Sequence, residues 1–138
     1  MACPASPASK IGRVPWAIWA ARAAPAVISA LHDTVVPRHK LPEVLEQVYE
    51  IAARHELLVL NVFHAGDGNL HPLLVYDARE PGVIDRVHAA GDEIVRVSVA
   101  AGGVLSGEHG IGLEKRDLMP LMFSEVDLAA QGDLRRAF

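Results

Sequence analysis

The most informative part of this sequence is Leu57-Leu-Val-Leu-Asn-Val-Phe-His64-Ala-Gly-Asp-Gly-Asn-Leu-His71-Pro-Leu-Leu-Val-Tyr76. Two runs of branched and apolar residues, each of strand length, lie on either side of a Gly-Asp-Gly-Asn segment. Glycine, asparagine and aspartate tolerate the positive φ angles that tight turns require. The pattern therefore predicts a β-hairpin with strands over 57–63 and 72–76.

The predicted hairpin also implies a register for its side chains. We expect three opposed pairs on one face: His64 with His71, Val62 with Leu73, and Leu60 with Val75. Directly opposed side chains in an antiparallel pair lie about 5 Å apart at Cβ. The two imidazoles would then be close enough to share one ion.

Amphipathic helices are predicted before and after the hairpin. Apolar residues recur at helical spacing over 42–55, where Pro42 suits the first turn, and again over 82–101, which is followed by Gly102 and Gly103. Three shorter elements are expected beyond them: a strand at 104–106, a partly helical segment at 115–123, and a last helix capped by Ser124. This order predicts an α+β fold, with an antiparallel sheet and helices packed on one face.

Composition limits the class of protein. The chain has 138 residues, of which 51% are hydrophobic, enough for the core of one domain. Its formal net charge of -4 argues against a nucleic-acid-binding surface, which needs a basic patch. Cys3 is the only cysteine, so neither a disulfide framework nor a cysteine zinc site is expected. A cytoplasmic location follows as the default expectation.

The N-terminal part differs from the rest in character. Residues 1–32 are predicted to be a divergent leader, poorly ordered or loosely packed, and residues 33–138 to form the domain. The apolar run in the leader contains Arg22 and prolines, so it predicts neither a secretory signal nor a membrane span.

Two glycine-rich segments gather the candidate ligands. His64, His71 and Glu108 would offer two nitrogens and one oxygen to a divalent cation and leave positions open for substrate or water. The alternative is that the two histidines merely flank a polar turn, and the spacing alone does not choose between these readings. His109 follows Glu108, so in an extended backbone it faces the other side and could act as a base, or it could be a solvent-exposed loop histidine.

Four further residues are candidates for supporting roles. Asp67 could orient an imidazole or bond its own turn backbone, and Asn69 suits a left-handed turn position. Gly107 and Gly110 are expected to shape the second loop. The sequence has no P-loop, no Gly-x-Ser-x-Gly and no His-Glu-x-x-His motif.

These residues carry a family resemblance. His64-Ala-Gly-Asp-Gly-Asn-Leu-His-Pro72 and Gly102-Gly-Val-Leu-Ser-Gly-Glu-His-Gly-Ile-Gly-Leu-Glu-Lys115 closely resemble the C-terminal domain of FAD-linked 2-hydroxyacid oxidoreductases of the glycolate oxidase and D-lactate dehydrogenase type. Pro37-Arg-His-Lys-Leu-Pro42 and Met119-Pro-Leu-Met-Phe-Ser124 fit the same family. The resemblance covers about Asp33 to Phe138.

The resemblance implies a mechanism and a fold. It implies that His64, His71 and Glu108 hold zinc or manganese, that His109 is the base, and that hydride passes from the substrate α-carbon to FAD. It also implies a ferredoxin-like arrangement. The FAD-binding domain of the family needs more residues than this chain offers, so the chain is expected to be the substrate-side domain alone, truncated at its C-terminus and inactive without a flavin domain.

The expected partners are a small 2-hydroxy acid and a separate flavin-domain chain, without nucleic acid or a membrane span. Self-association is expected through the face that a flavin domain would cover. Two other functions stay open at this point: a non-catalytic remnant or interaction module of the family, and a stand-alone metal-dependent hydrolase.

Overall fold

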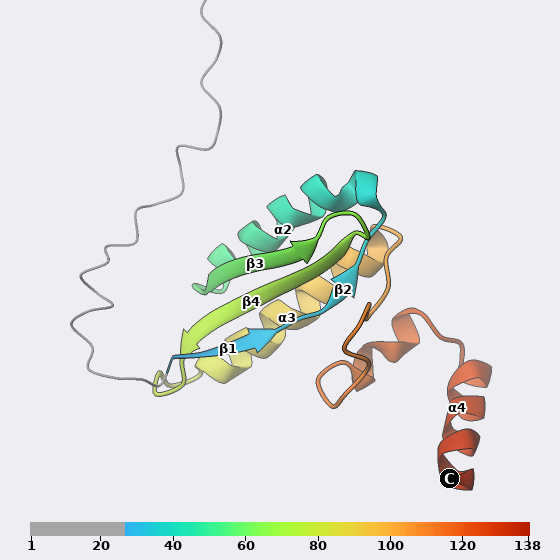
Figure 1. The fold of residues 1–138 in the computed structure, drawn as a ribbon. Coiled ribbons are helices and arrows are strands. Elements are labelled where there is room, and N and C mark those ends of the chain that lie inside the picture. The colour runs from blue at the N-terminus through green and yellow to red at the C-terminus, as the bar shows by residue number, and fades with distance from the viewer. Residues whose placement is uncertain (1–26) are drawn as a thin grey trace, which may run out of the picture.

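The computed structural model of the chain describes residues 27–138. Its elements are β1 (Val27–Leu31), β2 (Thr34–Val35), a 3-10 helix (Arg38–Lys40), α2 (Leu41–Arg54), β3 (Leu58–His64), β4 (Asn69–Asp77), α3 (Val83–Ala100), a 3-10 helix (Arg116–Leu121) and α4 (Glu125–Ala137) (Figure 1). The predicted α+β class is confirmed, and α2 and α3 agree with the predicted helices to within one residue at each end.

The sheet is antiparallel and is built around β4. β3 pairs with one edge of β4, while β1 and β2 pair one after the other with its opposite edge. An isolated antiparallel bridge joins Val35 to Val104 beyond β2. β1 and β2 together form the first strand of the fold and are followed by α2, and β4, the third strand, is followed by α3. With the bridge at Val104 in the place of the last strand, this gives the β-α-β-β-α-β order of ferredoxin-like folds. The strand predicted at 104–106 is reduced to that single bridge.

The predicted hairpin register is wrong by two residues. His64 lies opposite Asn69, and Val62 lies opposite His71. The pairing that we expected to join Leu60 to Val75 instead joins Leu60 to Leu73. The cause is that Asn69 begins β4 and does not belong to the turn, so the turn is confined to residues 65–68. Because side chains alternate with period two, this shift leaves both histidines on the same face of the sheet.

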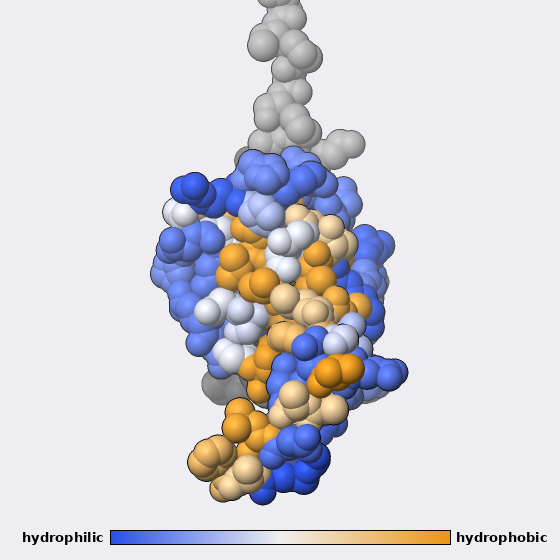
Figure 2. Space-filling view, turned by 90° about the vertical axis from the view of Figure 1, so that its right-hand side faces the viewer, coloured by the Kyte–Doolittle hydropathy of each residue, from blue (hydrophilic) through white to orange (hydrophobic). Residues whose placement is uncertain are grey.

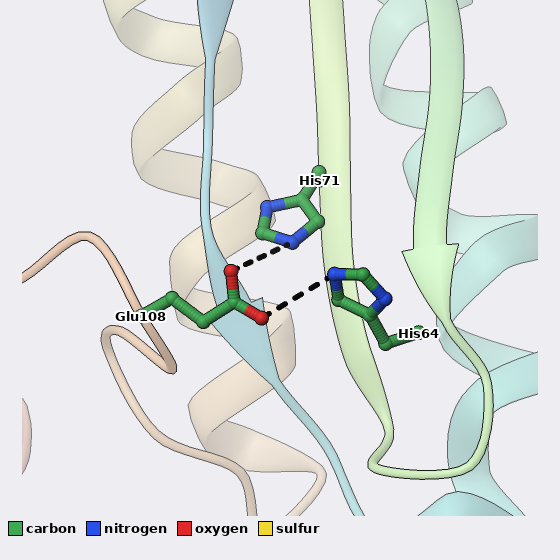
Figure 3. A group of neighbouring side chains, drawn as sticks. All are labelled: His64, His71 and Glu108. Carbon is green, nitrogen blue, oxygen red and sulfur yellow. Dashed lines mark ion pairs between the residues drawn. The ribbon is translucent and has the colours of Figure 1, made fainter.

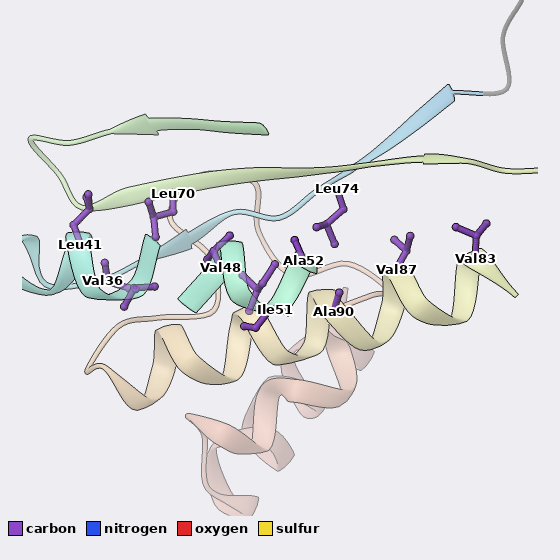
Figure 4. Close-up of a cluster of buried hydrophobic side chains, with 12 residues drawn as sticks. Val36, Leu41, Val48, Ile51, Ala52, Leu70, Leu74, Val83, Val87 and Ala90 are labelled. Atoms are coloured by element: carbon purple, nitrogen blue, oxygen red, sulfur yellow. The ribbon is translucent and has the colours of Figure 1, made fainter. Parts of the chain in front are cut away.

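One face of the sheet carries the hydrophobic core. α2 and α3 cover this face and meet β4 there (Figure 4). The buried side chains come from all three elements: Val44, Val48 and Ile51 from α2, Leu70 and Leu74 from β4, and Val83, Val87, Ala90 and Ile94 from α3. The even-numbered residues of β4 thus face the helices, and the odd-numbered ones, including His71, face the opposite side.

A smaller cluster fixes the C-terminal segment to this core. Val95 of α3 packs with Leu105 and Leu118, all three of them buried. Ser124 and Asp127 form a capping box at the start of α4, which confirms the predicted cap. α4 itself buries no residue and extends away from the sheet (Figure 1). Apolar residues reach the surface on the protruding C-terminal part and on the adjacent face of the domain (Figure 2).

The N-terminal strand β1 lies inside the range that the sequence predicts as leader. It pairs with β4 along its whole length, from Val27 to Leu31. The rest of the leader prediction concerns residues 1–26 and lies outside the described residues. Between residues 27 and 138, no helix is both long and apolar enough to span a bilayer.

Candidate metal centre

The hairpin brings the two predicted histidines together. His64 ends β3 and His71 is the third residue of β4, so they occupy neighbouring rows on the face that α2 and α3 leave uncovered. Their ring centroids are 5.4 Å apart, and the rings are nearly perpendicular (87°). His71 is buried and His64 is more than half exposed, so the pair lies at the boundary between the protein interior and solvent.

Glu108 completes a group of three ligand atoms (Figure 3). Its Oε1 lies 3.3 Å from Nε2 of His64, and its Oε2 lies 3.8 Å from Nε2 of His71. One ligand atom from each residue can be chosen so that all three lie within 4.8 Å of one another. The structure therefore brings together the three residues that the sequence singles out as ligands.

The donor set fits a divalent cation. Two imidazole nitrogens and a carboxylate oxygen are a common ligand set for zinc, and ligands about 2.1 Å from an ion at tetrahedral angles lie about 3.4 Å apart. The separations from His64 and His71 to the two different oxygens of Glu108, 3.3 and 3.8 Å, are close to this value, and with one atom chosen from each residue all three lie within 4.8 Å. Zinc or manganese could therefore be held by these residues with small side-chain movements.

The loop that carries Glu108 is held by a carboxylate from the other end of the chain. Oδ2 of Asp33 accepts a hydrogen bond from Ser106 Oγ (2.6 Å) and three from the backbone N–H groups of Gly107, Glu108 and His109 (2.9 Å each). Burial raises the pKa of Asp33, but these four hydrogen bonds outweigh it and lower the pKa to about 2. Asp33 is consequently a fixed negative charge beneath the loop.

Lys115 lies beside Asp33 and ties the end of the loop to its start. It is buried, and its Nζ donates hydrogen bonds to the backbone carbonyls of Asp33 and of Leu105, the second at 2.7 Å. Burial lowers the pKa of Lys115, while the charges of Asp33 and Glu114 act in the opposite direction. The two buried charges therefore stabilise one another.

His109 lies next to the three-residue group. Its ring stacks on that of His71, with centroids 5.0 Å apart and planes inclined by 22°. It is exposed, and it lines an open cavity of about 340 Å³ together with Leu31, Asp33, Leu113 and Lys115. The proposed base thus faces a space that a small molecule could enter.

The four residues predicted to have supporting roles lie around this centre. Asp67 is exposed in the hairpin turn, where its backbone N–H donates to the His64 carbonyl (3.0 Å). Asn69 is buried opposite His64. Gly107 must be small, because a Cβ there would lie 2.6 Å from Val35 Cγ2. Gly110 has a φ of +81°, which favours glycine.

Sequence reasoning missed Asp33 and Lys115. Asp33 is 73 residues from Ser106, and no local spacing links it to the glycine-rich loop. The available signal was indirect: a carboxylate directly precedes the short strand β2, and a buried carboxylate needs several donors to be stable. Lys115 ends the second glycine-rich motif, but no local spacing indicates that it is buried beside Asp33.

Residues 9–138 match the family model described as FAD linked oxidases, C-terminal domain. The chain belongs to this family. It is similar to the glycolate oxidase subunit GlcD of Escherichia coli (strain K12), with 43% identity over 106 residues, which are 77% of this chain and 21% of the relative.

Two other relatives extend the comparison. The GlcD subunit of Bacillus subtilis (strain 168) is 34% identical over 108 residues, which are 78% of this chain and 23% of that protein. A D-lactate dehydrogenase of Anaerostipes hadrus is 32% identical over 107 residues, which are 77% of this chain and 22% of that protein. The chain thus spans about a fifth of the length of the curated relatives that it matches, and its match lies in their C-terminal region.

Proposed function

We propose that this chain is the substrate-side domain of an FAD-dependent 2-hydroxyacid dehydrogenase or oxidase, of the glycolate or D-lactate type. The single observation that supports this most is the meeting of His64, His71 and Glu108 within 4.8 Å, in a chain of the FAD-linked oxidase family. His64 and His71 come from one hairpin and Glu108 from a loop 37 residues after His71, so the convergence of all three is not a consequence of local spacing.

Each residue of the candidate centre has a separate role in this proposal. His64, His71 and Glu108 would hold the cation and so place the hydroxyl and carboxylate of a 2-hydroxy acid beside His109. When bound, the cation supplies charge stabilisation to the substrate oxygens and the flavin supplies the hydride acceptor. His109 takes the hydroxyl proton, because a neutral imidazole is an effective base near neutral pH. The ring of His71 stacks on that of His109 and would help to orient it.

Exposed apolar residues on the uncovered face of the sheet support the proposal of a flavin-bearing partner. Leu60 and Val62 of β3 are 53% and 56% exposed, and the register puts them on the same face as His71. Leu31 of β1, 40% exposed, lies in the row of Leu60 and Leu73. Apolar surface beside the metal ligands suits a covering domain that excludes water from the reaction. About four fifths of the relatives' length lies outside the match and has room for that domain.

The experiment that tests the proposal is the metal content of the purified, folded chain by elemental mass spectrometry. We expect about one zinc or manganese per chain, and a loss of it in the His64→Ala/His71→Ala variant. His39→Ala is the matched control, since His39 is exposed on the 3-10 helix Arg38–Lys40 and outside the ligand group. A folded chain that binds neither metal when supplied with both would refute the metal site.

A second test addresses catalysis. A flavin-domain chain mixed with this chain should oxidise a 2-hydroxy acid, and His109→Ala should lower kcat while leaving metal content unchanged.

A stable complex without activity would instead favour a non-catalytic module of the family. Hydrolysis of simple esters by the metal-loaded chain alone would favour the hydrolase alternative. A small 2-hydroxy acid, a flavin-bearing partner and a cytoplasmic location all belong to this proposal.

A further inference from the structure

Asp33 is a buried carboxylate that reaches both halves of the candidate centre. It is 1% exposed, and its Oδ2 accepts the four hydrogen bonds that hold residues 106–109. Three of these come from successive backbone N–H groups, including those of Glu108 and His109. One oxygen atom therefore fixes the backbone from which a proposed ligand and the proposed base project.

The other carboxylate oxygen faces the hairpin. Oδ1 of Asp33 lies 3.9 Å from Nδ1 of His71. Both atoms are buried, and within the part of the chain that the structure describes neither has a hydrogen-bond partner. A separation of 3.9 Å exceeds the roughly 3 Å of a hydrogen bond, so a movement of about 1 Å would pair them. A buried acceptor and a buried ring nitrogen facing one another are complementary, because each is costly to leave unpaired.

The opposite edge of the His71 ring faces the cation site. Its Nε2 lies 3.8 Å from Oε2 of Glu108, on the side where the three ligand atoms converge. A neutral imidazole can offer the Nε2 lone pair to a cation only when its proton is on Nδ1. A carboxylate at Nδ1 stabilises this tautomer and the matching ring orientation.

We propose that Asp33 is the positioning residue of the centre: it selects the Nδ1–H tautomer of His71 and, through its second oxygen, holds Glu108 within reach of the same cation. This inference rests on the proposed function, since it concerns the same site. It assigns to one side chain the alignment of two ligands that are 37 residues apart. In this assignment Asp33 acts through His71 and Glu108 and is not itself a ligand.

The test is the Asp33→Asn variant, which keeps the shape of the side chain. Its amide oxygen can still accept from the loop, so the loop donors orient its NH2 group toward His71. A donor at this place repels a protonated Nδ1 and favours the Nε2–H tautomer, which cannot bind a cation through Nε2. Imidazole ¹⁵N chemical shifts and two-bond couplings at about pH 8, where free histidines are neutral, report the tautomer directly. We expect Nδ1–H in the wild type and Nε2–H in the variant.

Two control variants separate this role from a merely structural one. Ser106→Ala removes one donor to Oδ2 without touching Oδ1, and Asp133→Asn makes the same chemical change on the exposed helix α4, outside the candidate centre. Both should keep the Nδ1–H tautomer. In a competition titration with a chromophoric chelator, Asp33→Asn should weaken zinc binding about 10- to 100-fold, the usual effect of losing such a partner, and Asp133→Asn should leave it unchanged.

The outcomes are distinguishable. An Nε2–H tautomer in the wild type, or an Nδ1–H tautomer retained in a folded Asp33→Asn variant, would overturn the inference whatever the metal content. The wild-type tautomer decides this even if the variant does not fold. A tautomer that changes as expected in a chain that never binds zinc would support the role of Asp33 and refute the proposed metal site alone.

Discussion

The stability of this protein should fall when the solution is made mildly acidic, and His32 is the reason. His32 is 6% exposed, and both its ring nitrogens are buried without a hydrogen-bond partner among the described residues. Burial lowers its pKa from 6.5 to about 4, with smaller contributions from the charges of Lys115 and His88. The folded chain thus keeps His32 neutral at pH values at which the unfolded chain protonates it.

The sign and size of the effect follow from proton linkage. Above pH 6.5 neither state binds the proton, so the free energy of unfolding is unaffected. Between pH 6.5 and 4 the unfolded state binds more protons, and stability declines as the pH falls. At about 1.4 kcal/mol for each pKa unit, the full decline is about 3 kcal/mol, of which about 2 kcal/mol is lost between pH 7.5 and 5. That is a large share of the ~5–15 kcal/mol typical of a domain.

Urea unfolding followed by far-UV circular dichroism measures this decline. The comparison is with His32→Leu, which has a similar volume, removes the two unpaired nitrogens and cannot titrate. Between about pH 7.5 and 5 the wild type should lose about 2 kcal/mol more than His32→Leu, since the other histidines are common to both chains. Equal losses in the two proteins would refute the argument, because they would show that His32 is protonated equally in the folded and unfolded states.

Two other predictions follow from packing and exposure. Gly91→Ala should lower the free energy of unfolding by roughly 1 kcal/mol or more, because the added Cβ would lie 2.3 Å from Cε1 of His32. Gly132→Ala in the exposed α4 should instead raise the free energy of unfolding by about 0.5–1 kcal/mol through helix propensity. Thermal unfolding measures both effects, and stabilisation by both substitutions would contradict the close contact at Gly91. The chain without a flavin partner should self-associate at high concentration in light scattering, and Leu60→Lys with Val62→Lys should reduce this, because both residues are about half exposed on the uncovered sheet face. A strictly monomeric wild type would contradict that prediction.

Local sequence patterns were sufficient for most of the scaffold. Helical periodicity located α2 and α3, and Ser124 with Asp127 marked the start of α4. The secondary structure of residues 104–106 was harder to predict, because three apolar or small residues do not indicate whether a strand or a single bridge forms. That outcome depends on β2, which is only two residues long and lies about 70 residues earlier.

The convergence of His64 and His71 could be predicted despite the wrong register because a sheet repeats every two residues. Moving the partner of His64 from His71 to Asn69 changes the pairing but not the face, so the histidines still converge on one side. Glu108 is a different case, since no periodicity carries it to that face. Its position depends on four hydrogen bonds to Asp33 and on the burial of Leu105 and Leu118 against α3.

This difference explains why the sequence pointed to His64, His71 and Glu108 but not to Asp33. A candidate ligand can be recognised in the sequence by its residue type and by neighbouring glycines. The side chain that aligns it can be any carboxylate that the fold places beside the ligand loop. Asp33 reaches the site because β2 leads directly from it into the sheet beside Asn69, two residues before His71 in β4. The alignment of the centre is thus a property of the sheet topology, and changing Asp33 should disturb His71 and Glu108 together even though neither is its neighbour in sequence.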